Sequence, residues 1–140
     1  MARPTSFRLP GALLDRLSDE AAARGMSVTA LVATMLDEGL KTRRFPGIVY
    51  RDGPTGRRAG LAGGPDVWEI VRDLKHVQGP GEQRVQALAQ QIGLPAQRIR
   101  LALAFYAAFP EEIEERIAAD ERAAARLRVL IDQRNRLLAT

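Results

Sequence analysis

The N-terminal segment PTSFRLPGALL, residues 4–14, constrains the fold most, because it predicts a single β-strand that runs directly into a helix. Apolar and polar positions alternate, so that one face carries Thr5, Phe7 and Leu9 and the other carries Pro4, Ser6 and Arg8. No second strand lies nearby in the sequence. A lone strand leaves its backbone N–H and C=O groups unpaired, which is unfavourable and invites another chain. We therefore expect this strand to pair outside its own chain.

Two amphipathic helices are predicted to follow the strand. The first has an apolar stripe through Leu17 and Ala21 and ends at Gly25, a residue suited to a left-handed C-cap. Ser27 has the chemistry of an N-cap for the second helix, which runs past Leu40. Such a unit is too small to bury its own apolar faces. Two copies with their strands paired antiparallel about a two-fold axis would solve both problems, so we expect a homodimer through paired N-terminal strands.

Composition narrows the class of protein. The 140 residues are 46% hydrophobic but only 5% aromatic, which favours packed helices, and the net charge is +4. Cysteine is absent, which excludes disulfides, thiolate metal sites and a cysteine nucleophile. No apolar run reaches the roughly 18 residues of a transmembrane helix, and no signal peptide precedes the strand. We expect a cytoplasmic, mainly α protein that uses no cofactor or metal. No nucleophile–base pair supports an enzyme.

Beyond the strand and two helices predicted over residues 1–44, glycine and proline mark a change of structure. The strings GIVY and RRAGLA flank the turn sequence DGPTG, which predicts a short β-hairpin linker. Asp66 and Glu69 resemble a capping box that opens a helix over residues 67–77. Helices are also predicted over residues 83–92 and 95–108. These elements define a second unit, residues 45–109.

A helix-turn-helix pattern lies within the second unit. Ala89, Gly93 and Ile99 have the spacing of a small crossing residue, a left-handed turn and a core residue. The second of these helices is expected to present both polar and apolar side chains, namely Gln97, Arg98, Arg100, Leu101 and Phe105. The polar members suit phosphate or base contacts. The apolar members are more typical of a protein interface, which is the interpretation we favour here.

The segment of residues 110–140 is predicted to be one long helix. Pro110 suits its first position, and Glu111 and Glu112 suit the positive end of the helix dipole. Apolar residues run down one side, interrupted by Asp120 and Arg134. This irregular stripe predicts a helix that lies in a partner's groove. The alternatives are that the helix folds back on the helix-turn-helix unit or pairs with its dimer mate.

Residues 3–42 resemble the ribbon-helix-helix family of dimeric bacterial repressors, through SFRLP, LLDRL and GMSVTALV. The resemblance implies that the paired strands enter the DNA major groove, where Ser6 and Arg8 reach base edges with Pro4 at the margin. It also implies that the start of the second helix, at Ser27, Val28 and Thr29, binds a DNA phosphate. The alternative is an N-terminal arm that serves only for dimerisation.

Residues 46–109 resemble a bacterial domain-of-unknown-function family that has a helix-turn-helix core and is widespread in toxin–antitoxin loci. Together the two resemblances imply a VapB-type antitoxin that represses its own operon by binding operator DNA and neutralises a PIN-domain ribonuclease toxin. The implied toxin-binding residues lie on the last helix: Ile117, Arg122, Arg126, Leu127, Arg128, Leu130, Ile131 and Arg134. An arginine there could pair with the carboxylates of the toxin's metal site. The alternative is a stand-alone ribbon-helix-helix transcriptional regulator without a toxin.

Overall fold

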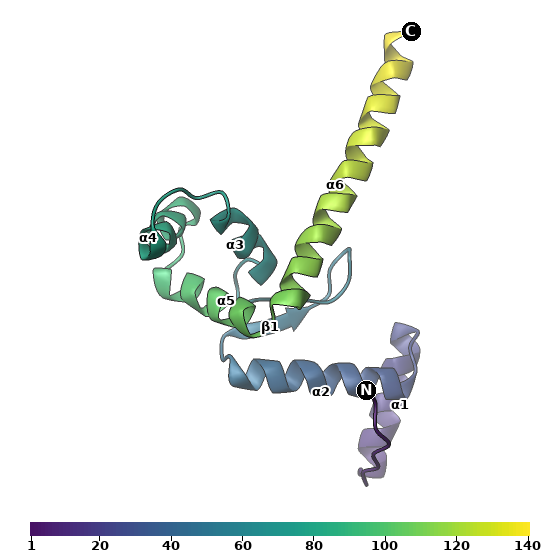
Figure 1. Cartoon of the computed structure of the whole chain (residues 1–140). Coiled ribbons are helices and arrows are strands. Elements are labelled where there is room, and N and C mark those ends of the chain that lie inside the picture. Colours follow the sequence, from purple (N-terminus) through teal and green to yellow (C-terminus); the bar gives the residue numbers. More distant parts are fainter. The chain divides into compact units, whose positions relative to one another are not determined.

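The computed structural model describes all 140 residues of the chain, which is mainly α-helical with a single two-stranded hairpin (Figure 1). The chain divides into two compact units, Met1–Arg44 and Phe45–Thr140. The long C-terminal helix therefore belongs to the same compact unit as the hairpin. None of the helices combines the length and the hydropathy needed to cross a bilayer.

The first unit consists of two helices joined by a tight turn. Helix α1 spans Gly11–Arg24 and α2 spans Val28–Arg44. Gly25 ends α1 in the left-handed region with φ of 66°, and the Met26 amide donates to the Ala21 carbonyl at 3.0 Å. The Ser27 hydroxyl accepts a hydrogen bond from the Ala30 amide at 3.1 Å. The predicted glycine C-cap and serine N-cap are both confirmed.

Residues 1–10 lie outside any helix or strand, and every one of them is exposed. A strand is defined by hydrogen bonds to a neighbouring strand, and the two helices of this unit offer none. The single chain therefore does not show the strand predicted over residues 5–9. Pairing of that segment between two copies of the chain stays a prediction.

The second unit begins with the predicted hairpin. Strand β1 (Ile48–Arg51) pairs antiparallel with β2 (Arg58–Leu61), with Ile48 opposite Leu61 and Arg51 opposite Arg58. The connecting turn is closed by a hydrogen bond from the Gly56 amide to the Gly53 carbonyl at 3.0 Å. Gly60 faces the Arg51 guanidinium, and any Cβ at this position would collide with it. Because Gly60 has no side chain, the Arg51 side chain can lie across the hairpin at this position.

Helix α3 (Val67–Leu74) follows Asp66, but the predicted capping box is wrong. The Asp66 carboxylate makes no cap hydrogen bond, and the Asp66 side chain is 7% exposed. Instead it accepts hydrogen bonds from Arg51 at 2.7 and 3.0 Å and from the Trp68 indole at 3.1 Å, and it pairs with Arg58 at 3.0 Å. Two guanidinium groups outcompete the helix amides because charge-assisted hydrogen bonds are the stronger ones. Asp66 therefore ties the hairpin to α3.

Helices α4 (Gly81–Ile92) and α5 (Ala96–Ala108) form the predicted helix-turn-helix pair. Gly93 has φ of 72° at the turn, while Ala89 and Ile99 are buried, as their spacing predicts. The prediction for Phe105 is wrong: it is 0% exposed and packs against Phe45 and Phe109. Its ring belongs to the core of the second unit, so α5 presents no exposed pair of apolar residues.

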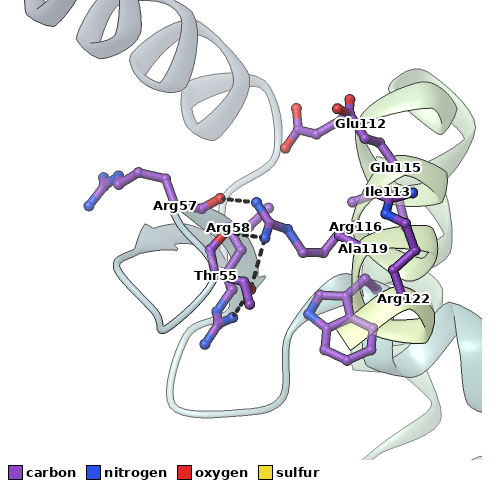
Figure 2. Close-up of a pocket in the computed structure, with 11 residues that line it drawn as sticks. Thr55, Arg57, Arg58, Glu112, Ile113, Glu115, Arg116, Ala119 and Arg122 are labelled. Carbon is purple, nitrogen blue, oxygen red and sulfur yellow. Dashed lines mark hydrogen bonds between the residues drawn. The ribbon is translucent and has the colours of Figure 1, made fainter. Parts of the chain in front are cut away.

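Helix α6 (Pro110–Ala139) has two different halves. Its first turns pack on the unit, with Ile113 and Ile117 buried. Arg116 donates to the Thr55 carbonyl oxygen at 2.6 Å in the hairpin turn (Figure 2). From residue 125 onward every residue is exposed. The first half of α6 thus folds back on the second unit, which is one of the alternatives that the sequence left open. The second half does not.

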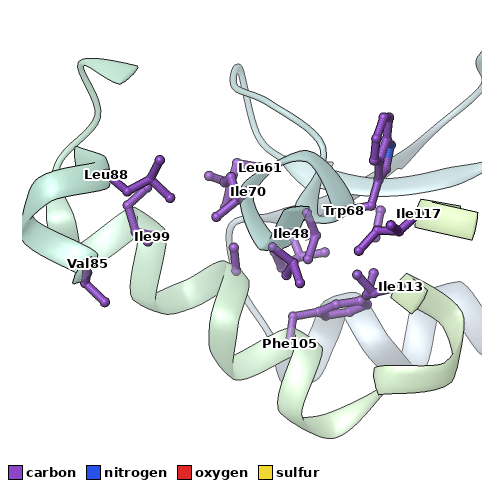
Figure 3. Close-up of a cluster of buried hydrophobic side chains, with 14 of the residues drawn as sticks. Ile48, Leu61, Trp68, Ile70, Val85, Leu88, Ile99, Phe105, Ile113 and Ile117 are labelled. Atoms are coloured by element: carbon purple, nitrogen blue, oxygen red, sulfur yellow. The ribbon is translucent and has the colours of Figure 1, made fainter. Parts of the chain in front are cut away.

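The core of the second unit is continuous across the hairpin and four helices. Figure 3 shows Val85, Leu88 and Ile99 where α4 meets α5. The same cluster extends to Phe105 and to Trp68, whose indole is 8% exposed. This core fixes the positions of the hairpin, of α3 and of the first half of α6.

Candidate nucleic-acid interface

The first unit has too small a core to be stable on its own. Only Leu17, Ala21 and Leu31 are buried, with Met26 and Val32 partly buried around them. A domain of this size is marginal because its surface is large for the volume that it encloses. The unit therefore needs additional apolar burial from outside.

An apolar face of the same unit is available for that burial. Apart from Met1, eight large apolar side chains of this unit are exposed: Phe7, Leu9, Leu13, Leu14, Val28, Met35, Leu36 and Leu40. The members on α2 recur with helical spacing, so they lie along one stripe of that helix. Phe7 is 77% exposed and Leu40 71% exposed. Apolar exposure of this extent in so small a unit indicates an interaction surface.

Every second residue of the N-terminal segment, from Pro4 to Arg8, belongs to the face for which the sequence predicts DNA contact. Pro4, Ser6 and Arg8 are all exposed. No residue of the chain forms a hydrogen bond or ion pair with the Arg8 guanidinium, so its five N–H donors are free. A free guanidinium on a narrow extended segment has the donor pattern that binds guanine bidentately in the major groove.

The beginning of α2 has the geometry of an anion site. Ser27 caps the helix through the Ala30 amide at 3.1 Å, and its carbonyl accepts from the Leu31 amide at 3.0 Å. The amides of Val28 and Thr29 lie in the first turn of α2, where helix amides have no intrahelical acceptor, and both residues are exposed. Free N–H groups at the positive end of a helix attract phosphate. The structure therefore contains the capping Ser27 and the first-turn amides of α2 that the sequence predicts for contact with the DNA backbone.

No protein-family profile, curated protein or solved structure matches the chain. What the first unit can do thus follows from its own residues. The free Arg8 guanidinium, the open helix N-terminus and the unburied apolar face lie within one small unit.

The second predicted polar surface, on α5, is largely engaged within the chain. Arg98 donates to the Ala62 carbonyl, and Arg100 pairs with Glu82 at 3.0 Å. The hydrogen bond from Arg100 lowers the pKa of Glu82 below its ordinary value. Gln97 is exposed, while Leu101 is partly buried against the core. Two of the three predicted polar residues thus bind the protein itself, which weakens α5 as a contact for DNA.

The predicted toxin-binding residues fall into two groups on α6. Ile117 is 5% exposed within the core, so the prediction that it contacts a partner is wrong. The remaining residues are exposed: Arg122, Arg126, Leu127, Arg128, Leu130, Ile131 and Arg134. The exposed half of α6 therefore combines apolar and cationic side chains on a helix that nothing in its own unit covers.

Sequence reasoning missed a cluster of arginines around the hairpin turn. Arg116 reaches Thr55 across 61 positions of sequence, and Arg51 reaches Asp66 across 15. No periodicity connects residues at such separations. The only local signal is the density of arginine in the hairpin, at Arg51, Arg57 and Arg58.

Proposed function

We propose that the chain is a homodimeric DNA-binding antitoxin that represses its own operon and neutralises a partner toxin. The observation that carries the DNA-binding part is the first unit, in which a three-residue core coexists with an exposed apolar face and a free Arg8. The toxin-binding part rests on the exposed half of α6 and on the resemblance to VapB-type antitoxins. By that resemblance, the partner is a PIN-domain ribonuclease.

Pairing of two N-terminal segments would give the first unit what it lacks. Phe7 and Leu9 of both protomers would be buried against α1 and α2, and the backbone of each segment would gain hydrogen-bond partners. The opposite face of the ribbon would then carry Ser6 and Arg8 twice, related by the two-fold axis. Arg8 would read guanine edges, and the two α2 N-termini would hold phosphates on either side.

The exposed half of α6 supports a protein partner of complementary chemistry. Leu127, Leu130 and Ile131 supply an apolar surface, and Arg126, Arg128 and Arg134 give it positive charge, to which Arg122 adds just before this half begins. A groove with an apolar floor and acidic rims fits this helix. Arginine binds carboxylates through paired hydrogen bonds, so an acidic metal site is a suitable target for one of these side chains.

The DNA-binding part is tested by two variants and a charge-matched control. The probe is the duplex upstream of the protein's own reading frame, in competition with a scrambled duplex at fixed salt. Arg8→Ala should cost about 1–3 kcal/mol on the operator and reduce the preference over the scrambled duplex. Ser27→Ala should weaken binding to both duplexes alike, because it perturbs a phosphate contact.

Arg128→Ala serves as the control, since it removes the same charge from the second unit. It should leave the operator preference unchanged. If Arg8→Ala keeps the full preference of the wild type, Arg8 does not read bases. If neither duplex binds the wild type, the proposed repressor function is wrong.

A further inference from the structure

A cavity of about 320 Å³ lies in the second unit, between the hairpin turn and the first turns of α6. Thr55, Arg57 and Arg58 line it from the hairpin side, and Arg116 and Arg122 line it from α6 (Figure 2). Its volume is at the lower end of the range found for small-molecule sites. The cavity is separate from the DNA-binding residues of the first unit, so its role does not depend on the DNA-binding part of the proposed function, although Arg122 also belongs to the proposed toxin-binding surface.

Two guanidinium groups are held in place at this cavity by one hydroxyl. Thr55 Oγ1 accepts hydrogen bonds from Arg58 at 3.3 Å and from Arg116 at 3.0 Å. Arg116 also donates to the carbonyl oxygens of Thr55 at 2.6 Å and Arg57 at 3.1 Å. These bonds use three of its five N–H groups and leave two for a ligand. The position of Arg116 is thus fixed before any ligand binds.

The charges around the cavity do not balance. Arg58 is paired with Asp66 at 3.0 Å, but Arg116 binds only carbonyl and hydroxyl oxygens, and Arg122 forms no hydrogen bond or ion pair with the chain. The carboxylates that line the cavity belong to Glu112 and Glu115, and Glu112 accepts from the Tyr50 hydroxyl at 2.6 Å. Two guanidinium groups without a carboxylate partner therefore face one cavity.

We propose that this cavity binds a phosphate monoester. Arg116 and Arg122 can each donate two hydrogen bonds to phosphate oxygens, which is the geometry in which guanidinium recognises this group. Trp68 also lines the cavity, with the Arg72 guanidinium over its ring at 4.9 Å, and can contact the ester substituent there. Its indole N–H is already bound to Asp66 at 3.1 Å, so the ring offers surface rather than a donor. A bound phosphate would link α6 to the hairpin turn through Arg116.

The chain contains its own reporter for this site, because Trp68 is the only tryptophan. The full-length protein is titrated with inorganic phosphate at constant ionic strength while the Trp68 emission is recorded. We expect a saturable change in emission. Arg122→Gln should weaken phosphate binding at least fivefold, and it removes no contact within the chain. Arg126→Gln, one turn further along α6, is the matched control and should bind as the wild type does.

Arg116→Gln should weaken binding more than Arg122→Gln does, with circular dichroism to confirm that the variant is folded. A signal that does not saturate would overturn the proposal, as would equal weakening in Arg122→Gln and Arg126→Gln. A third outcome also refutes it: Trp68 emission that responds to duplex DNA and not to inorganic phosphate would assign these arginines to a nucleic-acid surface instead.

Discussion

Replacing Phe7 by alanine should weaken self-association of the full-length chain without unfolding it. Phe7 is 77% exposed and lies outside both hydrophobic clusters of the chain, so its removal leaves the helices of the first unit intact. In the proposed dimer, the same side chain lies on the buried face of the paired strands. The variant therefore separates the energetics of association from those of folding.

The expected size of the effect follows from the exposed fraction. Complete burial of a phenylalanine side chain contributes about 1.5–3 kcal/mol. With about three quarters of the side chain available, each Phe7 contributes about 1–2 kcal/mol on association. A two-fold dimer buries two copies, which gives about 2–5 kcal/mol in total. Since 1.4 kcal/mol corresponds to a tenfold change, the dimer Kd should rise by a factor of about thirty to a few thousand.

Sedimentation equilibrium over a range of protein concentrations measures this Kd directly. Leu138→Ala is the matched control, because Leu138 is 74% exposed but lies in the second unit. The control should have the Kd of the wild type. A Kd that Phe7→Ala leaves unchanged, or a larger effect in Leu138→Ala, would show that the dimer forms elsewhere and would refute the paired-strand interface.

Three further predictions concern the second unit. Asp66→Asn should lower the free energy of unfolding, measured in urea, by about 2–3 kcal/mol, because it leaves two arginines facing a neutral group in a partly buried site. A change below about 0.5 kcal/mol, the size expected for a surface substitution, would contradict this role of Asp66. Hydrogen bonds lower the pKa of Glu114, and the bond from Lys75 has a larger effect than the bond from Tyr106. The ionised Glu114 therefore contributes to stability above the ordinary glutamate pKa of 4.5, and this contribution is lost as the pH falls through the lowered pKa. Glu114→Gln should therefore remove about 0.5 kcal/mol at pH 7 and none at pH 2, measured by thermal unfolding at both pH values. Truncation after Ala124 keeps the core but removes the exposed half of α6. It should preserve operator binding while abolishing capture of the protein encoded by the neighbouring reading frame. Retention of that capture would show that the exposed half of α6 is not the toxin-binding element.

The features that sequence predicted correctly depend on short-range chemistry. Gly25 and Gly93 end helices because a left-handed turn suits a residue without a side chain, and both are read from their immediate neighbours. The hairpin is equally local, since its turn sequence is flanked by short apolar strings. The N-cap at Ser27 is local as well, because the Ser27 hydroxyl accepts a hydrogen bond from an amide only three residues away.

The features that sequence predicted wrongly depend on partners that are distant in the chain. Asp66 has the spacing of a capping residue, but its carboxylate forms ion pairs with two arginines of the hairpin, Arg51 and Arg58. Helical spacing predicts an exposed Phe105, because spacing alone does not show which face of α5 the rings of Phe45 and Phe109 cover. In the candidate site, Arg8 and Ser27 could be selected from sequence, whereas the arginine cluster around Thr55 could not. The strand predicted over residues 5–9 would need a second chain to pair with, so its pairing stays a prediction.

The exposed half of α6 also has a consequence for the lifetime of the chain. Residues 125–139 form a helix on the order of 20 Å long that no other part of their unit covers. A helical segment of this length is marginal in water without tertiary contacts, so it opens locally at little cost in free energy. Each opening exposes Arg126, Arg128, Arg134 and Arg136 to cleavage by proteases. A partner that covers the helix closes this route, so the abundance of the chain in the cell should follow the supply of that partner.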